Sequence, residues 1–122
     1  MNPYGQELIL DLHGCDASKF TRESIERYLV ELCDMIKMTR EDLHWWDYEG
    51  EPEEYKQAPD HLKGTSCVQF IRTSAIVIHS LDVLEKMFIN IFSCKTFDSA
   101  TVVKFTECYF NGTAISMEID RD

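Results

Sequence analysis

The apolar residues of this chain fall into short runs separated by turn residues, with two longer stretches of helical spacing among them. A short apolar run flanked by turn residues predicts a β-strand, and apolar residues three and four apart predict a helix that covers a sheet. We therefore expect an α+β fold, a two-layer sandwich with two helices on one face of a largely antiparallel sheet. The expected strands are residues 7–12, 43–48, 67–72, 75–79, 87–94 and 115–119.

Both expected helices have recognisable ends. Thr21 or Ser18 can cap the start of the first helix, and Asp98 can cap the second, which should stop at Asn111-Gly112. With the strands, they give each half of the chain a similar strand-helix-strand-strand order. The apolar faces consist of Ile25, Tyr28, Leu29, Leu32 and Ile36 in the first helix, and of Val102, Phe105 and Tyr109 in the second.

Residues 49–63 separate these patterns with two prolines, several carboxylates and little periodicity, so we expect an exposed loop there. Trp45 and Trp46 stand just before it. Adjacent residues of a strand point to opposite faces, so at most one of the two rings can enter a given site. We expect these rings to pack in the core or at an interface.

Length and charge limit the class of protein. A chain of 122 residues fits a single domain over 1–122, and its net charge of −10 argues against nucleic acid as a partner. The longest apolar runs are too short to cross a membrane and no signal peptide is apparent, so we expect a cytoplasmic protein without membrane contact. Five cysteines without a C-x-x-C pair indicate reduced thiols and no metal site.

Three blocks of sequence resemble the small prokaryotic S-adenosylmethionine decarboxylase proenzymes. The blocks are GQELILDLHGCD at 5–16, GTSCVQFIRTSAIVIH at 64–79 and NIFSC at 90–94. They occur in the family's order, and the third stands at the family's spacing from the second. The resemblance implies a self-processing, pyruvoyl-dependent decarboxylase of polyamine biosynthesis, including spermidine, that acts on S-adenosylmethionine.

The resemblance also assigns residues. It implies cleavage between Thr73 and Ser74 into chains 1–73 and 74–122, with Ser74 becoming the pyruvoyl group that forms a Schiff base with the substrate amine. It further implies a homodimer whose two sheets face each other, with no metal and no pyridoxal phosphate. Ser66 and His79 match the family's processing residues, and Cys94 matches its catalytic proton donor.

These residue types suit the chemistry. A serine hydroxyl such as that of Ser74 can attack the preceding carbonyl once a neighbour, here Ser66, polarises it. The resulting ester must then lose its α-proton, for which a histidine such as His79 is a suitable base. A thiol such as that of Cys94 can return a proton to the carbanion left by carbon dioxide.

The sequence departs from the family at several positions. Thr73 replaces a glutamate before the cut, and Ala75 replaces a histidine after it. After His79 the chain has Ser-Leu-Asp-Val where the family has threonine, an aromatic, proline and a glutamate that holds the ribose. Residues 60–62 are Asp-His-Leu where the family places an aromatic against the adenine.

These departures leave alternatives open. Asp82 or Glu85 can replace the ribose ligand. Alternatively, the substrate is arginine or ornithine, and its cationic side chain can pair with Asp60, Glu53, Glu54 or Asp82. A third interpretation is an uncleaved, non-catalytic partner of an active decarboxylase. Ser74 and His79 are also an odd number of residues apart, so we expect the chain to turn or bulge near Ser74.

Overall fold

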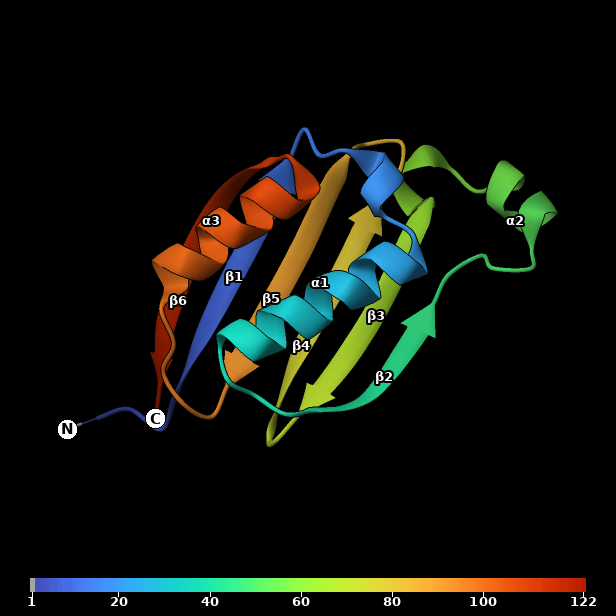
Figure 1. Cartoon of the computed structure of the whole chain (residues 1–122). Helices are drawn as coiled ribbons and strands as arrows, with labels where there is room; N and C mark the ends of the chain where they lie inside the picture. Colours follow the sequence, from blue (N-terminus) through green and yellow to red (C-terminus); the bar gives the residue numbers. More distant parts are fainter. Residues whose placement is uncertain (1) are drawn as a thin grey trace.

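The computed structural model describes residues 2–122 as a six-stranded antiparallel sheet covered by helices, which confirms the expected α+β class (Figure 1). The strand order is β2-β3-β4-β5-β1-β6. The strands are β1 (Gly5–His13), β2 (Arg40–Trp46), β3 (Gly64–Ile71), β4 (Ser74–Leu81), β5 (Lys86–Ser93) and β6 (Thr113–Arg121), and the helices are α1 (Arg22–Met35), α2 (Pro52–Gln57) and α3 (Ser99–Phe110), with 3-10 turns at Ala17–Lys19 and Asp60–Leu62.

Helices α1 and α3 lie side by side over one face of the sheet (Figure 1). Every second residue of the central strands points into the layer between them, as the period of a strand requires. Each aliphatic side chain buried there contributes about 1.5–3 kcal/mol relative to exposure. The strand residues of this core include Leu8, Leu10, Leu12, Ile76, Ile78, Met87, Ile89 and Ile91, all almost fully buried.

The expected helix caps are confirmed, and the two helices are joined by a buried tyrosine. Thr21 caps α1 and Asp98 caps α3, while Asn111 closes α3 in the left-handed conformation. Tyr28 of α1 is fully buried, and its hydroxyl lies 2.7 Å from that of Thr106 on α3. This bond satisfies a polar group that would be costly to bury alone.

The prediction of a loop over 49–63 is wrong in part, because α2 and a 3-10 turn form within it. Pro52 at the start of α2 has a φ suited to a first helical residue, and Glu53 and Glu54 interact favourably with the positive end of the helix. The helix buries no residue, so it lacks the apolar periodicity that reveals longer helices. In Figure 1 it projects beyond the β2 edge of the sheet.

Strand β2 begins three residues earlier than expected, and its register with β3 shifts between Arg40 and Leu43. The fully buried Gln69 of β3 holds this irregular stretch in place. Its side-chain amide donates to the carbonyl of Glu41 at 2.9 Å and its oxygen accepts from Arg40 Nε at 2.8 Å. The irregularity therefore depends on one polar core residue of a neighbouring strand.

Gly64 allows β3 and β4 to pair closely at the end away from their hairpin. A Cβ at this position would lie 1.7 Å from the carbonyl oxygen of Ser80. We expect G64A to lower the free energy of unfolding by about 2–3 kcal/mol, because backbone must move to relieve the overlap. A urea titration would measure this change in the free energy of unfolding. G50N is the control, because position 50 is open and has a positive φ, and it should lower the free energy of unfolding by about 0.5 kcal/mol or less.

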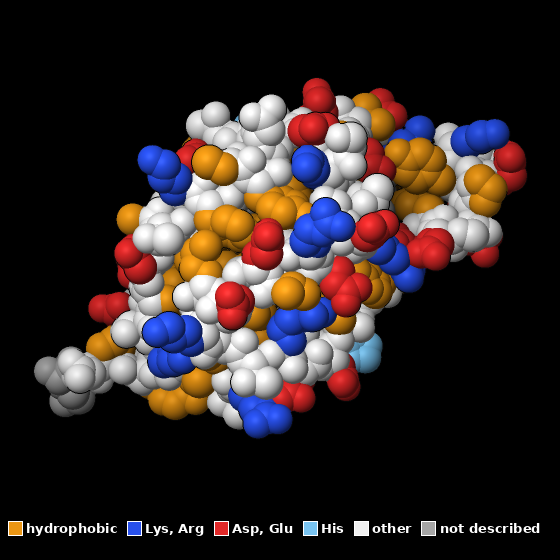
Figure 2. All heavy atoms as spheres, in the orientation of Figure 1, with side chains coloured by type: hydrophobic (Ala, Val, Ile, Leu, Met, Phe, Trp, Pro, Cys, Tyr) orange, Lys and Arg blue, Asp and Glu red, His pale blue; other side chains and the backbone are white. Residues whose placement is uncertain are grey.

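The two faces of the sheet differ. Figure 2 shows the helix side, where charged side chains of both signs surround apolar ones between the helices. The opposite face, which we call the open face, has no helix over it among residues 2–122, and no helix of this range is long and apolar enough to span a membrane. Its exposed large apolar side chains are Trp46, Phe70, Ile115, Met117 and Ile119.

Candidate active site

The expected cleavage point lies at a tight hairpin. Ile71, the last residue of β3, pairs with Ser74, the first residue of β4, so Arg72 and Thr73 alone form the connection. Both of these loop residues are exposed, whereas Ser74 is only 9% exposed. The Thr73–Ser74 bond therefore joins an accessible loop residue to a serine held in place by the sheet.

Cys94 follows β5 and lies against this hairpin. Its backbone N–H donates to Ser74 Oγ at 2.8 Å, and its thiol donates to the carbonyl of Arg72 at 3.5 Å. The backbone N–H of Thr73, followed by the hydroxyl of Ser74, lowers the pKa of the Cys94 thiol by stabilising the thiolate. The structure thus brings together the expected cleavage site and the expected proton donor.

We expect Cys94 to be the thiol that iodoacetamide alkylates most rapidly in uncleaved protein. Thiolate is the reactive form, and burial raises the pKa of Cys15 and Cys33 to about 11 and that of Cys67 to about 12. Peptide mapping of H79A protein, which we expect to remain uncleaved, would follow each site. The exposed Cys108 is the internal control, and labelling of Cys94 no faster than Cys108 across pH 6–9 would contradict a lowered pKa.

Ser66 and His79 form a second pair. They are directly opposite each other on β3 and β4, and Ser66 Oγ lies 2.8 Å from Nδ1 of His79. Both side chains are on the open face, where His79 is exposed. A hydroxyl bonded to one ring nitrogen fixes the orientation of the imidazole and leaves Nε2 free to exchange a proton.

The structure does not bring the two pairs together within one chain. Ser74 and His79 are five residues apart on β4, which corresponds to about 16 Å, and their side chains point to opposite faces. The turn expected near Ser74 is the hairpin at 72–73, and β4 itself pairs without a bulge. One copy of the chain therefore presents two half-sites.

The residues considered for substrate binding are scattered. Asp82 lies just after β4, where its carboxylate accepts a hydrogen bond from the Tyr55 hydroxyl at 2.9 Å and burial raises its pKa. Asp60 is exposed and pairs with Lys63 at 3.8 Å, and Glu85 is exposed in the β4–β5 turn. The structure brings none of these carboxylates to either half-site.

Two cavities flank β3 at the end away from the hairpin. A cavity of about 270 Å³ on the open side contains Ser66 and His79 in its lining, together with Trp46. A larger one of about 680 Å³ lies between the start of α1 and α2, and Asp82 lines it. Gly64, Thr65 and Tyr48 line both, so the two cavities share a wall.

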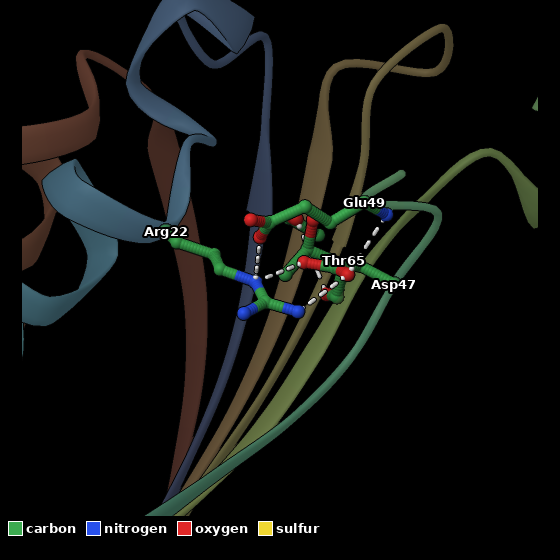
Figure 3. A network of polar contacts seen from close by, with 5 residues as sticks. Arg22, Asp47, Glu49 and Thr65 are labelled. Carbon is green, nitrogen blue, oxygen red and sulfur yellow. Dashed lines mark hydrogen bonds and ion pairs between the residues drawn. The ribbon is translucent and has the colours of Figure 1, made fainter. Parts of the chain in front are cut away.

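An ion-pair cluster fixes the segment between β2 and α2. Arg22, from the start of α1, points at Asp47 and Glu49 (Figure 3). Its Nε and Nη2 donate to Asp47 at 2.7 and 2.8 Å, and Glu49 lies 2.6 Å from Nε. The guanidinium holds the pKa of Asp47 below its usual value, so this clamp remains charged in neutral solution.

Sequence reasoning missed several residues that hold the cavity walls and the half-sites in place. Arg22 and Asp47 are 25 positions apart, and nothing in their local sequence predicts a bidentate pair. The buried Gln6 was missed for the same reason, although its Oε1 accepts from the Phe97 N–H at 3.1 Å and so anchors the segment after Cys94. Polar residues in otherwise apolar strand positions were the available signal for Gln6 and Gln69.

Comparison with known proteins gives one family match and one similar solved structure. The profile of the S-adenosylmethionine decarboxylase family matches residues 6–122. The chain belongs to that family. The crystal structure of the adenosylmethionine decarboxylase from Aquifex aeolicus VF5 is similar in fold, with a TM-score of 0.75 and 17% identity over 99% of this chain and 92% of that one. No curated protein sequence matches the chain significantly.

Membership of the S-adenosylmethionine decarboxylase family confirms the resemblance inferred from the three sequence blocks. All three lie within or overlap the matched range, and Ser66, Ser74, His79 and Cys94 fall inside it. The family is one of decarboxylases that generally depend on a pyruvoyl group. Among residues 2–122, no cluster of three or more histidine, cysteine, aspartate or glutamate side chains is arranged to hold a metal ion.

Proposed function

We propose that this protein is a self-processing, pyruvoyl-dependent S-adenosylmethionine decarboxylase. The observation that carries the proposal is the contact of Ser74 with Cys94 at the end of an exposed two-residue hairpin. That contact places the residue type needed for self-cleavage beside the residue type needed for protonation. Cleavage would yield chains 1–73 and 74–122.

The Ser74 hydroxyl has a neighbour that favours its use as an internal nucleophile. The Cys94 N–H, 2.8 Å from Oγ, stabilises negative charge that develops as the hydroxyl proton leaves. Attack on the Thr73 carbonyl forms an ester and breaks the amide, and the amide nitrogen takes up a proton. Loss of the α-proton of Ser74 then expels the Thr73 carboxylate and leaves a dehydroalanine at the new N-terminus. Its imine tautomer adds water and releases ammonia, which gives the ketone of the pyruvoyl group.

A base must take up both the hydroxyl proton and the α-proton of Ser74. The hydrogen bond that Ser74 Oγ accepts within the chain comes from the Cys94 N–H, which is a donor and not a base. His79 is the base that the family pattern supplies, but it lies about 16 Å away on the other face. We propose that the His79 of a second copy fills this role, in a homodimer whose open faces meet. Ser66, bonded to that histidine, would approach the hairpin with it.

The open face supports such a dimer. Three exposed apolar side chains follow one another along β6 on this face, namely Ile115, Met117 and Ile119. Leaving such a continuous apolar strip in water is unfavourable in free energy. Carboxylates lie among them, because Glu7 is directly opposite Ile119 and Asp11 is opposite Ile115. A two-fold arrangement would cover the apolar strip and complete two equivalent sites at once.

The pyruvoyl group would occupy the start of β4 after cleavage. Ser74 is buried there and contacts the Cys94 main chain, which fits a prosthetic group made from this residue. The group supplies an electron sink for loss of carbon dioxide from an α-amino acid. Cys94 carries its thiol at the same hairpin, beside the carbonyl of Arg72, and would supply the replacing proton.

Intact-mass measurement of the purified protein, combined with carbon dioxide release from carboxyl-labelled adenosylmethionine, tests the proposal. We expect two polypeptides, 1–73 and 74–122, the second without a free N-terminal amine, and release of labelled gas. A single full-length mass after prolonged incubation, with no gas released, would contradict it. Cleavage followed by release from arginine or ornithine alone would keep the processing chemistry and change the substrate.

A further inference from the structure

Cys94 is the first residue of the connection between β5 and α3, residues 94–98, which passes beside the start of β1 (Figure 1). Three main-chain N–H groups of this connection donate to side-chain oxygens. They are those of Cys94 to Ser74 at 2.8 Å, Lys95 to Ser93 at 3.2 Å and Phe97 to Gln6 at 3.1 Å. The place of Cys94 therefore depends on three side chains, one of which is the serine at the expected cleavage point.

Gln6 holds the connection from within the core. Its side chain is only 2% exposed and points to the same face of β1 as Leu8, two residues along the strand. Its Oε1 accepts from the Phe97 N–H, and its Nε2 donates to Ser99 Oγ at the start of α3. Both ends of the buried amide are thus bonded, and together they tie the end of the connection to the first turn of α3.

The backbone of β1 also lies close to Cys94. Gln6 is directly opposite Ser93 in the β1–β5 register. A Cβ on the preceding Gly5 would lie 2.1 Å from the Ser93 carbonyl oxygen and 3.1 Å from Cys94 Cα. The Gln6 amide is therefore mounted on a strand that packs directly against the residue it would position, which is the arrangement that fixes a functional side chain most precisely.

Cleavage as proposed removes the contacts between Cys94 and the hairpin. When the α-proton of Ser74 is lost, Oγ stays on the Thr73 carboxylate and leaves with chain 1–73, so the ketone at residue 74 has no hydroxyl to accept from the Cys94 N–H. The Arg72 carbonyl, which accepts from the Cys94 thiol, then lies beside a free chain end. Of the three side chains that hold the connection, Ser93 and Gln6 survive the reaction.

We propose that Gln6 is the positioning residue that keeps Cys94 beside residue 74 once the chain is cut. The inference rests on the proposed function and concerns the step after cleavage, when the thiol supplies its proton. Gln6 is favoured over Ser93 because its amide joins two separate points, the connection and α3, whereas Ser93 Oγ accepts only from the N–H two residues further on.

The reactivity of the Cys94 thiol tests this without any need for cleavage. S74A removes the serine oxygen from the uncleaved chain, as cleavage would, and H79A retains it. We expect Q6M to raise the midpoint pH of Cys94 alkylation by iodoacetamide by about 1 unit in S74A protein, because a thiol that drifts from the hairpin loses the N–H donor that stabilises its thiolate. In H79A protein the same substitution should shift the midpoint by less than about 0.3 units.

Q69M is the matched control for the loss of a buried amide. Gln69 is as buried as Gln6, but its side chain holds the irregular start of β2, so Q69M should leave the midpoint unchanged in both backgrounds. Equal shifts by Q6M in S74A and H79A, or the same shift by Q69M, would indicate a general loosening and overturn the assignment. If Q6M does not fold, S99A removes one of the two Gln6 bonds at a partly exposed position, and no shift in S74A/S99A would overturn it as well.

Kinetics of the processed protein supply a second measurement. We expect Q6M chains to cleave within about twofold of the wild-type rate, because Ser74 still holds Cys94 before the cut, and then to show a kcat for adenosylmethionine lowered about tenfold to a hundredfold with KM within about twofold. Slower cleavage with an unchanged kcat would contradict a role confined to the step after cleavage.

The two proposals fail in different ways. A wild-type chain that never cleaves would refute the enzymatic proposal, while a midpoint shift confined to S74A/Q6M would still show that Gln6 holds Cys94 when the serine oxygen is absent. Cleavage and gas release without that shift would do the reverse.

Discussion

The S74A protein is expected to remain a single uncleaved chain and to release no carbon dioxide from adenosylmethionine. Alanine removes the hydroxyl that is proposed to attack the Thr73 carbonyl, and it removes the precursor of the pyruvoyl group with it. The expected loss of activity is complete rather than partial, because no prosthetic group forms. Intact mass and a gas-release assay on the same preparation measure both effects.

Folding must be preserved for this result to be informative. Ser74 is at the start of β4 and its Oγ accepts one hydrogen bond, so its loss should cost about 1 kcal/mol. S116A is a suitable control, since Ser116 is an exposed strand serine on β6, far along the sheet from the hairpin. Cleavage of S74A at 73–74, or of neither S74A nor the wild type, would contradict the role assigned to Ser74.

The sequence was sufficient for the layers of this fold. Apolar residues two apart in the strands and three or four apart in the helices predicted which side of each element is buried, and Thr21, Asp98 and Asn111 marked the helix ends. The short α2 was missed because it buries nothing, so no period in its residues distinguishes it from a loop. A local sequence pattern therefore predicts a helix or strand only where that element buries one of its faces.

The candidate site was predictable as a set of residues but not as a geometry. The odd separation of Ser74 and His79 predicts opposite faces of a regular strand, and a turn or bulge near Ser74 is the local way to bring them together. Strand β4 pairs regularly on both sides and has no such bulge. Which residues meet across strands, as Trp46 meets Ser66, depends on register and lies beyond what local sequence determines.

Co-expression of S74A and H79A chains is expected to restore cleavage that neither chain shows alone. Within each copy, Ser74 and Cys94 form one half-site, and Ser66 and His79 the other, on the opposite face. A heterodimer would combine the intact Ser74 of the H79A chain with the intact His79 of the S74A chain. Random pairing places about half of the H79A chains in heterodimers, so about half should be cleaved.

Mass spectrometry identifies the chain that is cut, because the 74–122 fragment from the H79A chain carries the His79→Ala mass change. The matched control is co-expression of H79A with an S74A/H79A double variant, which forms similar dimers but supplies no imidazole at all. Rescue by S74A and not by the double variant would require His79 to act across the interface. Cleavage of H79A by itself, or no rescue in heterodimers isolated through tags on both chains, would instead mean that each copy completes its own site, and the open faces would need another reason to be apolar.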